Sequence, residues 1–370
     1  MSGAPSPRLT VDERITRLVP YSPGKPIEEV KRELGLSDVV KLASNENALG
    51  PSPLAADAIR EAAGRAHLYP EGSCHDLRHA VSEHRGIPGD HLIFGNGSDE
   101  IIHYLGLTYL TPGDEVIQAD PSFVRYESAA ILNGAPCHKV PLTADWEYDL
   151  GAMADRLSEH TRLIFIANPN NPTGTIVADG PLRHFLNCVP DRAIVVMDEA
   201  YLEFVERPEF PDSLALIREG RNVAALRTFS KTYGLAGIRL GYGIARPEII
   251  AHLEQVREPF NVSLLAQAAG IAALRDTEFL QRTRAMNRAG KRQLYAAFED
   301  LGLPFTPTEG NFVWVDVRRS CLEVFQALLR RGIIVRTGDI FGAPTHLRVT
   351  IGTESQNARF LAALKEALEE

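Results

Sequence analysis

A single lysine stands in a stretch that is unusually rich in glycine and in cations. Residues 228–242 read TFSKTYGLAGIRLGY, with Lys231 near the beginning and Arg239 near the end. The stretch follows the apolar run 223–226 and fits no helical period, so it is predicted to be a loop at the end of a strand. A lysine on such a loop can form a Schiff base with an aldehyde if desolvation or nearby positive charge lowers its pKa. Taken alone, a solvated surface lysine is the simpler interpretation.

Two segments contain groups that bind phosphate. In the first, the hydroxyl of Thr228 and the guanidinium of Arg239 could hold one anion. In the second, the predicted strand 92–94 runs into GNGSDE, where free N–H groups at Gly97, Ser98 and Asp99 could cradle a phosphate at the beginning of a helix. The signal is weak, because the third glycine of a dinucleotide fingerprint is missing. The acids of the first turn would also oppose an anion.

Polar side chains follow two further predicted strands. Asp198 comes directly after the apolar run 193–197, with Tyr201 three residues later. The run before Asp198 predicts a partly buried carboxylate, although acids at strand ends are common on surfaces. The strand 163–167 ends in NPNNPTG, a rigid turn in which the amide of Asn171 can donate to a ligand oxygen.

An aromatic residue lies near the same edge. Phe123 follows the predicted strand 115–119 and is expected one turn into a helix over 123–132. There it could stack on a planar ring. Core packing is the commoner explanation of a single phenylalanine.

The order of the elements predicts an α/β fold. Helices and short apolar strands alternate from about residue 53 to 226, which indicates βαβ units and a mostly parallel sheet covered by helices. Ligands of such sheets bind beyond the carboxyl ends of the strands, where all of the residues above would lie. We predict an N-terminal arm (1–40, with 1–10 disordered), a large cofactor-binding domain (41–263) and a smaller α+β domain (264–370).

Composition limits the function classes. The chain has 370 residues, 24% of them charged, and a formal net charge of -9. This charge argues against nucleic acid or an anionic membrane as the main partner, and no run is long enough to span a bilayer. The four cysteines lack paired spacing, which predicts no metal site and reduced thiols in a cytoplasmic protein.

One ligand would use all of these groups. Pyridoxal phosphate has an aldehyde for a lysine, a ring nitrogen for an acid, a phenolate oxygen, an aromatic face and a phosphate. The turn at 168–174, the Asp198 and Tyr201 pair and the segment from Lys231 to Arg239 resemble the cofactor-site motifs of fold type I aminotransferases. The segments 41–47, 69–70, 95–100 and 347–353 are similar to the histidinol-phosphate aminotransferase branch. One departure is Ala48, where that branch usually has proline.

The resemblance implies roles for the cofactor residues. Lys231 would bond to the cofactor aldehyde and shuttle a proton, and Asp198 would hold the proton of the ring nitrogen. Asn171 and Tyr201 would bond to the ring oxygen, and Tyr69 would reach the cofactor phosphate of the other subunit. The family is a homodimer with its sites at the subunit interface.

The implied reaction is transamination of L-histidinol phosphate with 2-oxoglutarate. Tyr21 on the arm, Asn45, Asn47 and the two arginines Arg336 and Arg348 are the expected substrate contacts, since two guanidinium groups suit a phosphate or a carboxylate. Three alternatives stay open: an aromatic amino-acid aminotransferase of the same branch, a cofactor-linked decarboxylase of phosphorylated amino acids, and a binding protein that has kept the fold. The last is disfavoured because Lys231 and Asp198 are both present.

Overall fold

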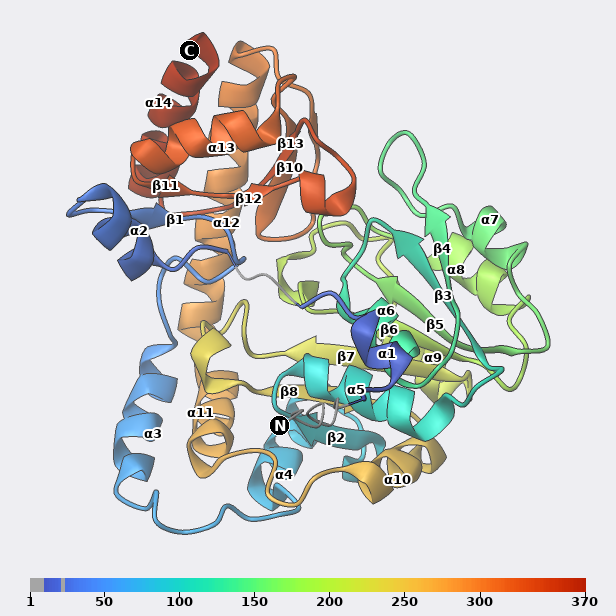
Figure 1. The fold of residues 1–370 in the computed structure, drawn as a ribbon. Helices are drawn as coiled ribbons and strands as arrows, with labels where there is room; N and C mark the ends of the chain where they lie inside the picture. Colours follow the sequence, from blue (N-terminus) through green and yellow to red (C-terminus); the bar gives the residue numbers. More distant parts are fainter. Residues whose placement is uncertain (1–9, 21–23) are drawn as a thin grey trace, which may run out of the picture.

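The computed structural model describes residues 10–20 and 24–370. Most of the segment predicted to be disordered, and the predicted substrate contact Tyr21, lie outside these ranges. The largest element is a seven-stranded sheet in the order β2-β8-β7-β6-β5-β3-β4 (Figure 1). Every neighbouring pair is parallel except those made by β8, which runs antiparallel to β2 and β7. The strands are β2 (Leu92–Gly95), β3 (Glu115–Asp120), β4 (Cys137–Pro141), β5 (Thr161–Ala167), β6 (Ile194–Asp198), β7 (Val223–Thr228) and β8 (Gly241–Ile244).

Helices cover both faces of this sheet, so its strands are apolar on both sides. Along β5 the side chains alternate, with Ile164 and Ile166 in one core and Leu163 and Phe165 in the other. One face is covered by α5 (Ser98–Tyr109), α6 (Arg125–Leu132) and α10 (Pro247–Val256). The other face is covered by α3 (Pro53–Ala63), α4 (His75–Arg85), α7 (Leu150–Ala154), α8 (Asp179–Leu186), α9 (Ser213–Arg218) and α11 (Leu264–Arg275). The predicted α/β class with a mostly parallel sheet is therefore confirmed.

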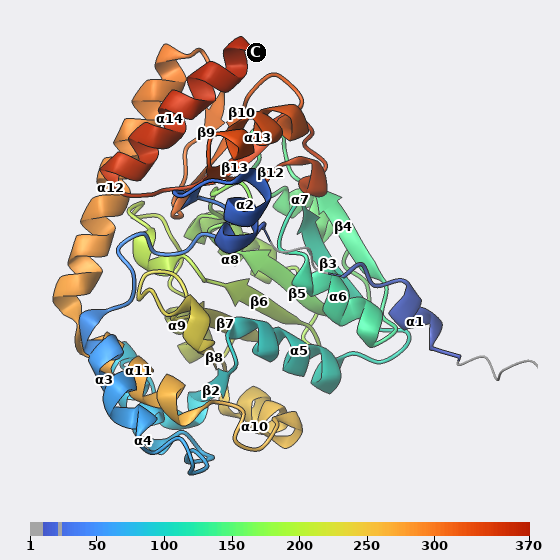
Figure 2. The same ribbon diagram turned by 60° about the vertical axis from the view of Figure 1, so that its left-hand side comes forward.

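A second, smaller core lies at one end of the large sheet (Figure 2). Its four-stranded antiparallel sheet has the order β12-β13-β10-β9. The long helix α12 (Thr277–Asp300) rises from the level of α11 into this core and contributes Leu294 and Phe298 to it (Figure 1). The other elements here are β9 (Phe305–Thr306), β10 (Phe312–Asp316), α13 (Cys321–Arg330), β11 (Ile333–Ile334), β12 (Arg336–Thr337), β13 (His346–Thr350) and α14 (Glu354–Glu369).

The N-terminal part of the chain packs against both cores. The short helix α1 (Glu13–Thr16) lies beside α6, whereas α2 (Ile27–Leu34) packs its Val30 with residues of α13 and β11. The strand β1 (Val40–Lys41) pairs in parallel with β11. The predicted domain boundary at 263/264 remains a prediction; α11, which follows it, packs against α3 and α4. No helix in the described part of the chain is both long and apolar enough to cross a membrane.

Two local predictions were wrong. The last residues of the stretch 228–242 are not loop, because Gly241 and Tyr242 belong to β8, whose two glycines concealed it. Phe123 does not lie inside a helix, since α6 begins at Arg125. The segment before α6 is tied instead to the turn at 168–174, where the Ser122 hydroxyl donates to Asn170 Oδ1 at 2.9 Å.

Candidate active site

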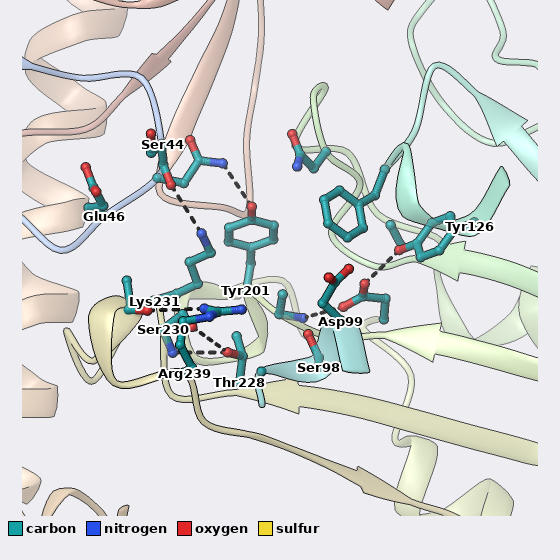
Figure 3. A pocket seen from close by; sticks show the side chains of 18 of the residues that line it. Ser44, Glu46, Ser98, Asp99, Tyr126, Tyr201, Thr228, Ser230, Lys231 and Arg239 are labelled. Atoms are coloured by element: carbon teal, nitrogen blue, oxygen red, sulfur yellow. Dashed lines mark hydrogen bonds between the residues drawn. The ribbon is translucent and has the colours of Figure 1, made fainter. Parts of the chain in front are cut away.

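A cavity of about 280 Å³ lies at the carboxyl ends of the parallel strands (Figure 3). The strands β5, β6 and β7 end at its floor, at Ala167, Asp198 and Thr228, and the small core closes it from above with Arg348. Most of the predicted cofactor residues share this one cavity. They are Gly97, Ser98, Asp99, Phe123, Asn171, Asp198, Tyr201, Thr228, Lys231 and Arg239.

Lys231 points across the cavity from the loop after β7. Its Nζ donates to the carbonyl oxygen of Ser44 at 3.2 Å and lies 5.7 Å from the centre of the Tyr201 ring (Figure 3). Burial lowers the pKa of this amine to about 8, and the nearby guanidinium groups of Arg348 and Arg239 contribute to the lowering, whereas Glu46 acts in the opposite direction. Lys231 is therefore far closer to its neutral, nucleophilic form at physiological pH than an exposed lysine would be.

Asp198 is a buried carboxylate at the end of β6, with 6% of the residue exposed. Burial raises its pKa to about 6, while the hydroxyl of Tyr126, which donates to Oδ2 at 2.7 Å, favours the charged form. The backbone N–H of Ala200 also donates to Oδ1, at 3.3 Å. The result is an oriented carboxylate that is charged above about pH 6 and can hold a proton on a ligand.

Donors for an anion gather at one side of the cavity. The hydroxyls of Thr228 and Ser230 lie 2.9 Å apart, and both residues are buried. The helix α5 begins at Ser98, so its first free N–H groups point to the same place. Arg239 adds a guanidinium group beside Gly97. A phosphate group fits this set of hydroxyls, backbone donors and cation. We call the set (Ser98, Thr228, Ser230 and Arg239) the anion cradle.

Two glycines keep this anion cradle open. Gly97 has φ of +79°, and a Cβ there would meet the Arg239 guanidinium. Gly241 lies on β8 against the backbone N of Ser98, where a Cβ would collide with that nitrogen. A side chain at either position would therefore collide with a donor of the cradle, the Arg239 guanidinium or the backbone N of Ser98.

The acids in the first turn of α5 are paired away from the anion cradle. Asp99 Oδ1 accepts from Arg125 Nε at 2.8 Å. Glu100 Oε2 accepts from the backbone N of Asn96 and from Asn261 Nδ2, both at 2.7 Å. The repulsion that these two acids would exert on a bound anion is therefore reduced, because Arg125 neutralises Asp99 and hydrogen bonds hold Glu100 to other groups.

Two amides join the cavity to the small core. Asn171 Oδ1 accepts from Arg348 Nη1 at 2.5 Å, and Asn45 Nδ2 donates to the Tyr201 hydroxyl at 2.9 Å. The other two asparagines of the turn bond to the protein. Asn168 bonds to Val177 through both ends of its amide, and Asn170 donates to Thr173 Oγ1 at 3.0 Å. Only Asn171 of the turn's three asparagines lines the cavity.

A second cavity of about 360 Å³ adjoins the first and shares Phe123, Asn171 and Arg348 with it. Both predicted substrate arginines, Arg336 and Arg348, line it. They face each other as a register pair on β12 and β13. The arm contributes Arg17, Leu18, Val19 and Pro20 to its wall.

Two predicted site residues lie elsewhere in this chain. Asn47 does not line either cavity, because its amide donates to the carbonyl of Thr232 at 2.8 Å and to Thr283 Oγ1 at 3.1 Å. Asn47 thus holds a loop, and its assignment as a substrate contact is not supported by its position. Tyr69 is 82% exposed, with its ring stacked on that of Phe260 at 4.8 Å.

Some functional groups escaped the sequence analysis. Tyr126 was overlooked, although it lies three residues after Phe123 and supplies the hydrogen bond that orients Asp198. Ser230 stands beside Lys231 and would have been a natural second hydroxyl. Ser44 and Glu46 line the cavity from the same loop as Asn45, and no periodic signal distinguishes which residues of that loop face inward.

Comparison with known proteins identifies the family to which this chain belongs. The curated proteins named histidinol-phosphate aminotransferase include one from Moorella thermoacetica, 55% identical to this chain over 96% of it and 92% of the relative. Another, from Symbiobacterium thermophilum, is 52% identical over 98% of this chain and 99% of the relative. Among solved structures, the histidinol-phosphate aminotransferase of Sinorhizobium meliloti in complex with pyridoxal-5'-phosphate superposes with a TM-score of 0.90, at 27% identity over 98% of this chain and 99% of that one. The family model for aminotransferase class I and II matches residues 37–364. The chain therefore belongs to the class I and II aminotransferase family.

Proposed function

We propose that this protein is a pyridoxal-phosphate-dependent aminotransferase of histidine biosynthesis. It transfers the amino group from L-histidinol phosphate to 2-oxoglutarate, with imidazole acetol phosphate and L-glutamate as products. The observation that carries the proposal is one cavity in which a lysine of lowered pKa, a buried carboxylate and an anion cradle meet. The relatives named histidinol-phosphate aminotransferase support the choice of substrate.

The cofactor fits the donors of the cavity. Its phosphate suits the cradle of Ser98, Thr228, Ser230 and Arg239, where Gly97 leaves room for it. Asp198 would hold the proton of the ring nitrogen, Asn171 and Tyr201 would bond to the ring oxygen, and Phe123 offers an aromatic face to the ring. Bound pyridoxal phosphate supplies an aldehyde that takes the amino group and a protonated ring that accepts electrons from the neighbouring carbon.

The chain's own groups then move and hold the protons. Lys231 Nζ would bond to the cofactor aldehyde and, as a free amine, would accept a proton from the substrate carbon and donate one back during transfer of the amino group. Its lowered pKa suits this work, because the amine must be neutral to accept a proton and charged to return it. The Asp198 carboxylate would hold the proton on the ring nitrogen, and the hydrogen bond from Tyr126 favours the charged form of Asp198 and orients it.

The second cavity would hold the substrate. Arg336 and Arg348 come from facing strands and suit a phosphate dianion on one substrate and a carboxylate on the other. Asn45 is placed to support Tyr201. The proposal includes a cytoplasmic homodimer in which Tyr69 reaches the cofactor phosphate of the other subunit; the exposed, stacked ring of Tyr69 supports it.

A substrate panel tests the proposal. With 2-oxoglutarate as acceptor, kcat/KM for L-histidinol phosphate should exceed that for L-phenylalanine and L-tyrosine, and no carbon dioxide should be released. A higher kcat/KM for phenylalanine would assign the protein to the aromatic amino-acid aminotransferases of the same branch, with the cofactor chemistry unchanged. Carbon dioxide release would indicate a decarboxylase instead.

A further inference from the structure

Directly behind the cavity lies a pair of opposite charges that is almost completely buried. The side chain of Glu199 is 0% exposed and that of Arg227 is 6% exposed. Arg227 Nε donates to Glu199 Oε2 at 2.8 Å, and the Ser213 hydroxyl donates to Oε1 at 2.5 Å. Removing two charges from water costs free energy that their attraction often fails to recover, so a buried ion pair is weak evidence of a role in stability alone.

Both partners are chain neighbours of cavity residues. Glu199 follows Asp198, and Arg227 precedes Thr228. The backbone N–H of Glu199 also donates to the carbonyl of Leu226 at 2.8 Å. A side-chain bond and a backbone bond therefore clasp the residue after Asp198 to the end of β7.

The same pair is part of the electrostatic environment of Asp198. Burial is the largest cause of the raised Asp198 pKa, and the carboxylates of Asp99 and Glu199 add to it, because a like charge disfavours the ionised form. Each of these two neighbours is matched by a guanidinium, Asp99 by Arg125 and Glu199 by Arg227. The titratable and charged groups that face Asp198 are Asp99 with Arg125 from α5 and α6, Tyr126 from α6, Tyr148 before α7, Tyr201 and Glu199 from its own loop, and Lys231 from the loop after β7.

We propose that Arg227 is a positioning residue for Asp198: by pairing with Glu199 it holds the end of β6 on β7 and neutralises the adjacent carboxylate, so that Asp198 stays charged under the cofactor ring. The role of Asp198 itself rests on the proposed function above. Arg227 lines neither cavity, so it acts on Asp198 from outside the site.

Two single substitutions are expected to shift the pKa of Asp198 in opposite directions. Arg227→Met leaves the Glu199 charge uncompensated and should raise the pKa of Asp198 by about one unit. Glu199→Gln removes that charge and leaves the cation of Arg227, so it should lower the pKa of Asp198 by a similar amount. The amide oxygen introduced by Glu199→Gln can still accept from Arg227, and the Ser213 hydroxyl can rotate to accept from the amide nitrogen.

The first measurement needs no activity. The full-length chain, stripped of cofactor and labelled with ¹³C at aspartate carboxyl carbons, is titrated by NMR, and Asp198→Asn identifies the Asp198 signal. Arg227→Lys, which keeps the charge, should titrate like the unaltered chain. The control is Arg78→Met, which breaks the partly buried pair of Arg78 and Glu254 at 2.9 Å and should leave the Asp198 titration unchanged.

The reconstituted enzyme supplies the second measurement. The acid limb of the kcat profile should move up in pH for Arg227→Met and down for Glu199→Gln, separately from any change in melting temperature. Shifts in the same direction for both variants, or an unshifted Asp198 signal in either, would overturn the inference. If Arg227→Met does not fold, Glu199→Gln tests the inference alone, because a downward shift of the Asp198 pKa in that variant is still required. A fully active Asp198→Asn enzyme would instead overturn the proposed role of Asp198 itself.

Discussion

Arg348 of the small core donates to Asn171 in the turn after β5 at 2.5 Å, although 177 positions separate them in the chain. The second terminal nitrogen of Arg348 donates to the carbonyl of Ala43 at 2.6 Å. One guanidinium thus joins the small core, the turn after β5 and the N-terminal loop. It also adds a positive charge near Lys231, which is among the causes of the lowered lysine pKa.

The lowered pKa of Lys231 predicts how fast the cofactor is taken up. Only the neutral amine attacks an aldehyde, so the rate of pyridoxal phosphate incorporation into the cofactor-free protein should rise about tenfold per pH unit up to about pH 8 and then level off. Stopped-flow absorbance measures this rate. Lys231→Ala should show no covalent incorporation and no transamination. An incorporation rate that keeps rising to about pH 10, near the ordinary lysine pKa, would contradict the lowered value.

Asp198→Asn should bind the cofactor but lose catalytic rate. The amide cannot stabilise a proton on the ring nitrogen as a carboxylate does, and losses of about 10²-fold or more in kcat are typical when such a group is removed. Steady-state kinetics measure the loss. Tyr126→Phe removes only the hydrogen bond to Asp198 and should raise the pKa of the carboxyl, which moves the acid limb of the profile to higher pH. Unchanged rates in Asp198→Asn would mean that the acid is merely structural.

Substitution of the two predicted substrate arginines should have different effects on the kinetics. Arg336→Met should reduce kcat/KM for histidinol phosphate more than for an unphosphorylated amino acid, because a dianion gains more from two guanidinium groups. Arg348→Met should also raise the pH midpoint of cofactor incorporation, since one of the charges that lower the Lys231 pKa is lost. Equal effects of the two substitutions on both measurements would argue against the division of roles.

Hybrid dimers test the proposed contribution of Tyr69. A mixture of Lys231→Ala and Tyr69→Ala chains should recover part of the activity, because one site of the hybrid combines an intact Lys231 with Tyr69 from the other chain. The matched control mixes Lys231→Ala with Asp198→Asn chains. Each defect lies in its own chain's cavity, so every site of the hybrid carries one defect and no intact site forms. If hybrids form without activity in the first mixture, Tyr69 serves its own subunit or none.

The strands that carry the chemistry were predictable because they are short, apolar and followed at once by polar residues. Asp198, Asn171 and Lys231 were found in this way, since parallel strands bring their carboxyl ends together. The strand β8 was not found, because Gly241 and Gly243 have low strand propensity. A Cβ at Gly241 would meet the backbone of Ser98, and one at Gly243 would meet the side chain of Ile93, and only the folded chain reveals these contacts. Asn47 was placed in the site for a related reason: loop sequence does not show which side chains turn inward.

The pairing of β1 with β11 has a consequence for synthesis on the ribosome. Val40 and Leu42 donate to the carbonyls of Gly332 and Ile334, and the backbone N–H of Thr350 donates to the carbonyl of Leu42. Residues 40–42 are therefore held by partners that are translated much later. Ser44 and Glu46, which line the cavity, follow directly. Nascent chains emerge from the N-terminus onward. The segment 40–46, which forms part of the cavity wall, therefore leaves the exit tunnel long before the strands that hold it. The large sheet can form earlier, but the site is incomplete until β11 and β13 have been synthesised.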